Sequence, residues 1–177
     1  TTLLRALPRS GLTLGTRNAL ALVLVTAQRP GEVAGLDWAE VDGRWWTVPG
    51  ERSKNKKPNR VWLTDLVLEL LPPRQKSGPA FPGPDGQSLK TNTLAMALAR
   101  WRKGPNWPAT IKPFCPHDLR RSAASGMTGQ GTPRLVVSKI LNHTEVGVTA
   151  VYDRSSYDRE KEKALTGWSR HLVALRD

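Results

Sequence analysis

The sequence has little cysteine, little tyrosine and few acidic residues. Its single cysteine, Cys115, cannot form an internal disulfide framework or a Cys-rich zinc site. Its longest strongly apolar run, residues 19–27, is too short to span a lipid bilayer. Only 15 Asp and Glu oppose 27 Lys and Arg, so the net charge is +12 with His counted as neutral. This excess indicates a polyanionic partner, with nucleic acid favoured over a membrane surface.

The rest of the composition predicts one folded domain. Seven Trp and many Leu and Val supply apolar surface for a core, which excludes a disordered chain. Neither an internal repeat nor a shift in composition divides the chain, so we expect a single domain over residues 1–177. The chain begins with Thr1 and has no recognisable signal segment. Together with the single cysteine, these features favour an excised domain of a protein from a reducing cytoplasm.

Apolar periodicity and helix-breaking residues predict a mainly helical chain. Thr16 is expected to cap the first long helix, and Ser155 or Ser156 the last. Two β-prone stretches, residues 41–48 and 59–63, flank a polar turn and predict a small antiparallel sheet with a basic hairpin. The expected fold class is α+β, predominantly α-helical. The expected helices cover residues 18–26, 32–36, 65–71, 91–103, 117–127, 134–141 and 158–172, with a short helix or turn over 146–152.

Two segments place basic side chains at the ends of helices. Arg29 follows the apolar helix, where it either neutralises the helix dipole or grips two phosphate oxygens with its planar guanidinium. Glu32, one turn later, is expected to position Arg29 or the nearby backbone. His117 and Arg120 lie three residues apart at a helix start and share one face. Either Asp118 caps this helix and His117 is solvated, or His117 and Arg120 converge on one anion that the helix dipole favours.

Residues 52–60 contain five basic side chains and no acidic one. Such a run is either a solvated surface or a finger that follows the phosphates of a nucleic acid. A single lysine on such a tip can also donate a proton to a leaving oxygen, and Lys54 is the candidate. The five basic residues are Arg52, Lys54, Lys56, Lys57 and Arg60.

A histidine and two tyrosines complete the candidates. For His143, which follows the helix over residues 134–141, a cap or a surface role is the ordinary interpretation. Packing explains Tyr157 at a helix start, whereas Tyr152 lies in a connection that swings into a cleft more easily. Cys115 is two residues from His117, and residues so spaced do not face each other on a helix, which argues against a thiol nucleophile. The sequence contains no metal-binding set and no P-loop pattern.

Six residues in this order resemble the catalytic set of the tyrosine recombinases, the site-specific integrase family: Arg29, Lys54, His117, Arg120, His143 and Tyr152. The strings TAQRPGE, SKNK, PHDLRR, LNH and VTAVYDR resemble the boxes of that family, and the YDRSSY string is most similar to integrases of prophages and genomic islands. The resemblance covers residues 12–170, and Ala27 departs from the glycine often found before the first arginine. The upstream core-binding and arm-binding domains of the family are expected to be absent, which leaves the catalytic domain.

The resemblance implies a DNA strand transferase that needs no metal, ATP or other cofactor. A phosphodiester under attack gains negative charge, which cations must stabilise where no metal does. By the resemblance, Arg29 and Arg120 bind the non-bridging oxygens, and Lys54 protonates the departing 5′ oxygen. His143 hydrogen-bonds the scissile phosphate. Tyr152 is then the nucleophile that forms a 3′-phosphotyrosyl intermediate.

By the same resemblance, His117 assists as an acid or base, and the protein integrates or excises a prophage or mobile element. The implied partners are double-stranded DNA attachment sites and further copies of the chain, in a bacterial or phage-encoded cytoplasmic protein with no membrane partner. We expect a homotetramer on DNA that exchanges the last helix between subunits, and a monomer for the isolated chain. Docking of that helix on its own domain is the alternative. Further DNA contacts are expected from Arg52, Lys56, Lys57, Arg60 and Arg121.

Two other functions compete with this one. A non-catalytic DNA-binding module would suit the basic balance and the short helices. A type IB topoisomerase would share much of the chemistry but would relax supercoils without exchanging partners. All six catalytic positions are occupied by the expected residue types, and the boxes resemble integrases more closely, so both alternatives rank lower.

Overall fold

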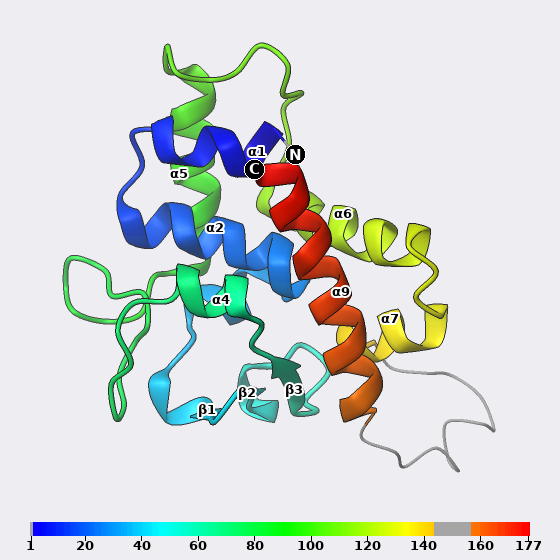
Figure 1. Ribbon diagram of the computed structural model, residues 1–177. Helices are drawn as coiled ribbons and strands as arrows, with labels where there is room; N and C mark the ends of the chain where they lie inside the picture. Colours follow the sequence, from blue (N-terminus) through cyan, green and yellow to red (C-terminus); the bar gives the residue numbers. More distant parts are fainter. Residues whose placement is uncertain (1, 144–156) are drawn as a thin grey trace.

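Helices dominate the fold, and one small antiparallel sheet lies at one end of the molecule (Figure 1). The computed structural model describes residues 2–143 and 157–177. The expected α+β class with predominant helix is confirmed. The helices are α1 (Thr2–Ala6), α2 (Leu14–Thr26), α3 (Pro30–Ala34), α4 (Asp65–Leu70), α5 (Thr91–Lys103), α6 (Pro116–Gly129), α7 (Arg134–Ile140) and α9 (Asp158–Arg176). Short 3-10 helices are η1 (Leu7–Arg9), η2 (Trp38–Glu40) and η3 (Gly50–Arg52), and the strands are β1 (Val41–Asp42), β2 (Trp45–Val48) and β3 (Asn59–Trp62).

The central helix is α2, which contacts α3, α4, α5, α6 and α9. Residues 19–26 of α2 are all buried, as expected for a helix that is apolar on every side. The expected cap at Thr16 is wrong, because the side chain of Thr13 accepts the backbone N–H of Thr16 and α2 begins earlier. Within the described residues, no helix is both long enough and apolar enough to cross a membrane.

The sheet has the strand order β1-β2-β3, and its hairpin confirms the expected one. Trp46 pairs with Val61, and both side chains face the core. On the other face the rings of Trp45 and Trp62 meet edge to face, 5.1 Å apart, and the Arg60 guanidinium lies 4.5 Å from the Trp45 ring. The period of two along each strand therefore separates an apolar inner face from a basic and aromatic outer face.

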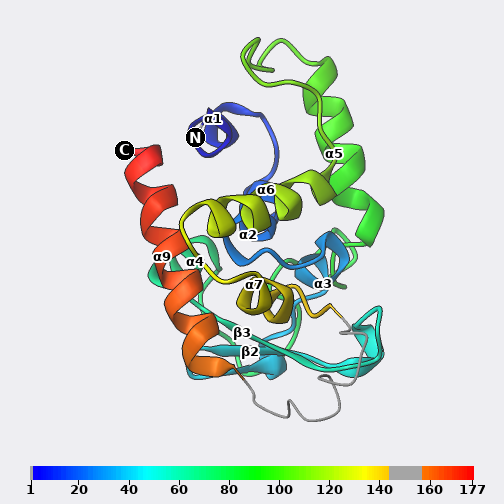
Figure 2. The same ribbon diagram turned by 90° about the vertical axis from the view of Figure 1, so that its right-hand side faces the viewer.

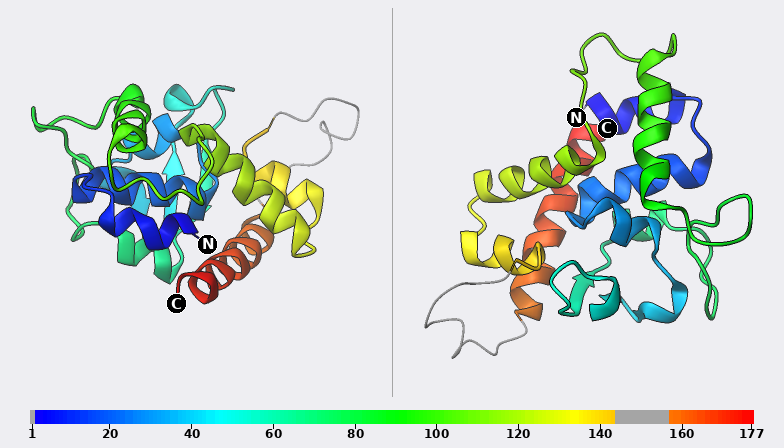
Figure 3. Two further views of the ribbon diagram at one scale, coloured as in Figure 1. Left: turned by 90° about the horizontal axis from the view of Figure 1, so that it is seen from above. Right: turned by 180° about the vertical axis from the view of Figure 1, so that it is seen from behind.

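The last helix, α9, packs on its own domain and runs from the sheet to the region of α1 (Figures 1 and 3). The side chains of Leu165, Trp168 and Leu172 on one face of α9 are buried. Near the end of α9, the backbone carbonyl of Arg176 accepts the Nε–H of Arg5 at 2.7 Å. The expected serine cap is wrong, because the residue before α9 is Tyr157, in a left-handed conformation (φ 53°) and without a capping side-chain bond.

Candidate active site

Arg29 stands at the junction between α2 and α3. Ala27 ends α2 in a left-handed conformation, and Arg29 then occupies the position before α3, with Pro30 as the first helical residue. The buried carboxylate of Glu32 holds Arg29 twice, because Oε1 accepts from Nη1 at 2.7 Å and Oε2 accepts from the backbone N–H at 3.0 Å. Glu32 therefore positions both Arg29 and its backbone, as the sequence suggested.

Arg120 is buried in the first turns of α6, at 3% exposure. Its Nη1 donates to the carbonyl of Ala27 at 2.7 Å, and its Nη2 donates to the carbonyl of Leu141 at 2.6 Å. These carbonyls follow α2 and α7, so one guanidinium joins the negative ends of two helices. Burial, and after it the positive charge of Arg29, lower the pKa of Arg120 to about 10, against an opposite effect of Glu32. Arg120 therefore stays charged at neutral pH.

His117 lies in the first turn of α6, on the surface. Partial burial lowers its pKa, and the positive charges of Arg120, Arg121 and Arg29 lower it further, against a smaller opposite effect of Asp118. Asp118 has the capping role considered above, because its Oδ2 accepts the backbone N–H of Cys115 at 2.9 Å. The two interpretations of this helix start are therefore compatible. Asp118 binds a free backbone N–H at the start of α6, while His117 lies close enough to Arg120 and Arg29 to be affected by their charges.

His143 follows α7 directly. α7 ends in a Schellman motif, in which Asn142 is left-handed (φ 49°) and the N–H of His143 donates to the carbonyl of Ser138 at 3.1 Å. Burial lowers the pKa of His143, and the charges of Arg120, Arg29 and His117 add to this effect. The same two arginines act on both histidines, so the four groups share one electropositive neighbourhood.

Lys54 is exposed in the turn between η3 and β3. This turn is bound to the end of α7, because Asn55 Nδ2 donates to the backbone carbonyl of Asn142 at 2.8 Å. Figure 2 shows α7 between α6 and the strands of the sheet. The hydrogen bond to Asn142 brings the hairpin next to His143.

A buried polar network supports the site, and the sequence analysis missed it. Gln28 is fully buried before Arg29; its Nε2 donates to the carbonyl of Ile140 at 3.0 Å, and its Oε1 accepts from Asn59 Nδ2 at 3.0 Å. Lys161 of α9 donates to Asn59 Oδ1 at 3.0 Å, and burial lowers the pKa of Lys161 to about 8. The available signal was a lysine on the apolar stripe of the last helix. The network joins α2, α7, α9 and β3 directly behind Arg29.

The residues expected to contact DNA divide into two groups. Arg52 donates to the two carboxylate oxygens of Glu40, at 2.9 and 2.6 Å, and Arg60 pairs with Asp158. By contrast, Lys56 and Lys57 are exposed on the turn. Arg121 is also exposed and pairs with Asp118 at 3.2 Å.

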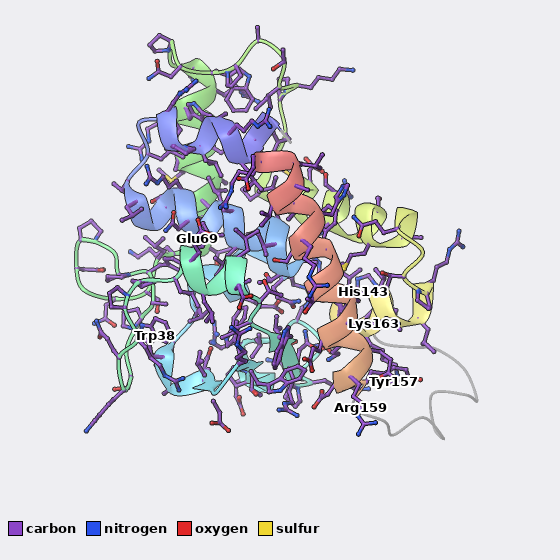
Figure 4. The ribbon with its side chains drawn as sticks, viewed as in Figure 1. Trp38, Glu69, His143, Tyr157, Arg159 and Lys163 are labelled. Carbon is purple, nitrogen blue, oxygen red and sulfur yellow. The ribbon has the colours of Figure 1, made fainter. Side chains whose placement is uncertain are left out.

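Of the two tyrosines, only Tyr157 is among the residues that the structure describes. Tyr152 and the expected helix or turn over residues 146–152 lie outside the described residues. Figure 4 shows Tyr157 at the start of α9, where Lys139 Nζ lies 4.8 Å from the centre of its ring. This contact agrees with a packing role for Tyr157. Among the described residues, no three His, Cys, Asp or Glu side chains are grouped so that they could bind a metal ion.

The lowered pKa values of the two histidines predict that the protein loses stability in acid. Because the pKa of His117 and that of His143 lie below the ordinary 6.5, the unfolded chain binds more protons, and the free energy of unfolding falls as the pH drops below about 6.5. Thermal midpoints measured from about pH 7.5 to about pH 5.5 test this. The double variant His117→Asn/His143→Asn should flatten the profile, and an unchanged profile would contradict the prediction.

Comparison with known proteins identifies the family. A model described as the phage integrase family matches residues 1–159. The chain belongs to the phage integrase family. Prophage integrase IntA of Escherichia coli K12 is 27% identical over 185 residues, which cover 99% of this integrase-family chain and 43% of IntA. Tyrosine recombinase XerC of Bradyrhizobium diazoefficiens is 26% identical over 142 residues, which cover 75% of the chain and 43% of XerC. The chain thus spans less than half the length of these relatives.

Solved integrase structures share the fold. The integrase from mycobacterium phage Brujita has a TM-score of 0.69 at 19% identity, over 93% of this chain and 55% of that one. A lambda integrase dimer bound to a COC′ core site has a TM-score of 0.64 at 20% identity, over 81% of this chain and 55% of that one. The fold predicted from the sequence, that of tyrosine recombinase catalytic domains, is therefore the observed one.

Proposed function

We propose that this protein is the catalytic domain of a site-specific DNA recombinase that integrates or excises a prophage or mobile element. The observation that carries the proposal is the shared neighbourhood of Arg29, Arg120, His117 and His143, built by the ends of α2 and α7 and the start of α6. Two arginines beside two histidines of lowered pKa form a site for one anion. Membership of the phage integrase family makes a DNA phosphodiester the fitting anion.

The chemistry follows from the charges. The Tyr152 oxygen attacks phosphorus, the bond from phosphorus to the 5′ oxygen breaks, and a 3′-phosphotyrosyl bond forms. The phenol proton passes to a base, for which His117 is the candidate, and Lys54 supplies the proton that the 5′ oxygen takes up. A 5′ hydroxyl of another strand then reverses these steps. The phosphodiester energy is kept in the tyrosyl bond, so ATP is not required.

The arginines stabilise the charge that gathers on the non-bridging oxygens. Arg120 has five N–H donors and uses one on each of Nη1 and Nη2 for the carbonyls of Ala27 and Leu141, so other donors remain for an oxygen. Arg29 is held by Glu32 and is 20% exposed. Both guanidinium groups are fixed before substrate binds, which avoids reorganisation during the reaction.

The partners belong to the same proposal. The fitting ligand is double-stranded DNA that carries an attachment site. The exposed Lys56 and Lys57, together with Arg121, would contact its phosphates, and the protein would act in the cytoplasm of a bacterium. We also propose a homotetramer on DNA. For α9 the structure contains the alternative to exchange, docking on its own domain through Leu165 and Trp168, so assembly without transfer of α9 is the simpler arrangement.

The test is covalent capture of DNA. The protein is incubated with a nicked duplex that carries the junction sequence of its own mobile element, and denaturing gels are examined for a protein–DNA band. The wild type and the matched control Tyr157→Phe should form the adduct, and Tyr152→Phe should not, because it lacks the nucleophilic oxygen. Absence of an adduct with the wild type, or an equal adduct with Tyr152→Phe, would contradict the proposal. Relaxation of supercoils without strand joining would instead indicate a topoisomerase.

A further inference from the structure

Asn142 does more than end α7. Its left-handed backbone (φ 49°) is required by the Schellman motif that places His143, and glycine would satisfy that requirement without strain. The amide side chain is therefore not needed for the helix end. It must be explained by what it touches.

The amide of Asn142 binds the turn that carries Lys54. Asn142 Nδ2 lies within donating distance of Ser53 Oγ (3.0 Å), Asn55 Oδ1 (3.2 Å) and the carbonyl of Lys57 (3.0 Å). In return, Asn55 Nδ2 donates to the carbonyl of Asn142 at 2.8 Å and to its Oδ1 at 3.2 Å. These bonds, called here the Asn142 latch, hold residues on both sides of Lys54.

The turn needs such support. Residues 52–60 contain no acidic side chain, and Lys54, Lys56 and Lys57 are all exposed on the same short turn. Lys56 is itself left-handed (φ 59°), a conformation that lysine adopts at a cost. Repulsion and backbone strain both favour release of the turn, and the latch opposes them. Its partner Ser53 is only 2% exposed, so competition from water at that contact is small.

We propose that Asn142 is a positioning residue for Lys54: one side chain fixes the lysine turn against the same helix end that places His143. Lys54 and His143, which are expected to act on one scissile phosphate, are thereby held at a fixed position relative to each other. This inference rests on the proposed function for the role of Lys54 as proton donor, whereas the latch itself is independent of that function.

Asn142→Gly is the variant that removes the latch and keeps the backbone. Without the amide, trypsin should cleave after Lys54 and Lys56 about tenfold faster, because the turn opens more often. Cleavage after Lys103, at the exposed end of α5, should keep its rate and serves as the internal control. Asn55→Ala should act similarly from the other side, and the double variant should add little to either single change. Equal rates of cleavage after Lys54 in wild type and Asn142→Gly would overturn the latch.

The catalytic consequence is tested with two DNA substrates. One has the ordinary 5′ oxygen at the scissile position, and the other has a 5′ sulfur, whose thiolate leaves without being protonated. Asn142→Gly should slow adduct formation on the oxygen substrate between about tenfold and a hundredfold, in the range expected for a misplaced proton donor. It should leave the sulfur substrate nearly unaffected, and Lys54→Ala should show the same contrast.

The outcomes separate the two proposals. Equal loss on both substrates would overturn the positioning of Lys54 by Asn142, even if the tryptic cleavage changed. Absence of an adduct for the wild type on either substrate would contradict the proposed function, and the tryptic experiment would still decide whether the latch exists.

Discussion

Arg120→Lys is expected to slow formation of the covalent DNA adduct about a hundredfold to a thousandfold, the effect of removing one fixed donor from a developing negative charge. Lysine keeps the positive charge but has no planar fork. The Nη1 and Nη2 atoms of Arg120 bond the carbonyls of Ala27 and Leu141 and retain donors for an oxygen. A lysine has its three donors on one nitrogen, which cannot occupy both positions. The measurement is the single-turnover rate on the nicked duplex.

The control for this prediction lies next to it in the sequence. Arg121 is exposed on α6 and pairs only with Asp118 among the described residues. Arg121→Lys should therefore change the rate by no more than a few-fold. Arg120→Lys is also expected to lower the free energy of unfolding by about 1–3 kcal/mol, through an unpaired carbonyl, so rates are compared well below its thermal midpoint. A rate within threefold of wild type, roughly 0.6 kcal/mol, would contradict the role of the fork.

Trp168→Ala is expected to lower the free energy of unfolding by about 3–5 kcal/mol. The indole is buried, its Nε1 donates to the carbonyl of Leu24 at 2.9 Å, and it fills the gap beside Gly126, where an added Cβ would lie 2.4 Å from the ring. The substitution therefore creates a cavity between α2, α6 and α9 and also removes the partner of a carbonyl. Urea unfolding followed by circular dichroism measures the change.

Two variants make this prediction specific. Trp168→Phe keeps most of the ring but leaves the Leu24 carbonyl without its donor, so its loss should be smaller, about 1–3 kcal/mol. Arg170→Ala, exposed on the same helix, should stay within about 0.5 kcal/mol of wild type. If α9 were held only by a neighbouring subunit, Trp168→Ala would weaken assembly and leave the stability of the monomer unchanged, which would contradict docking of α9 on its own domain.

Local structure was largely readable from the sequence. The helix expected over residues 91–103 is α5 with the same bounds, and the basic hairpin lies between β2 and β3 as expected. The errors concern helix bounds and caps: the helix expected over residues 32–36 is α3, Pro30–Ala34, and both α2 and α9 are longer than expected. Thr13 and Thr16 are both suitable capping residues, and the sequence does not show which of them leaves the helical conformation. Before α9, Tyr157 occupies the position expected for a serine; its backbone is left-handed and its side chain makes no capping bond.

The site was predictable in residue type but not in its connections. Arg29, His117, Arg120 and His143 were found from their order and local strings, because each stands at a helix end that Pro, Gly or Asn marks. The partners that hold them were not found. Asn55 and Asn142 are 87 residues apart, and Asn59 and Lys161 are 102 apart. No local pattern reports such pairs.

The sequence by itself determined the fold class, which follows from periodicity and helix breakers. Through the order of a few motifs that resemble a known family, it also determined the family and the residue types of the candidate site. Only the tertiary structure decided which of the basic side chains expected to contact DNA are already paired with a carboxylate. Arg52 and Arg60 resemble Lys56 and Lys57 in the sequence, yet Glu40 and Asp158 pair with the two arginines. The physical reason is that an ion pair depends on distance in space. Only the folding of η2 and η3 around the sheet and the packing of α9 on β3 set these two distances.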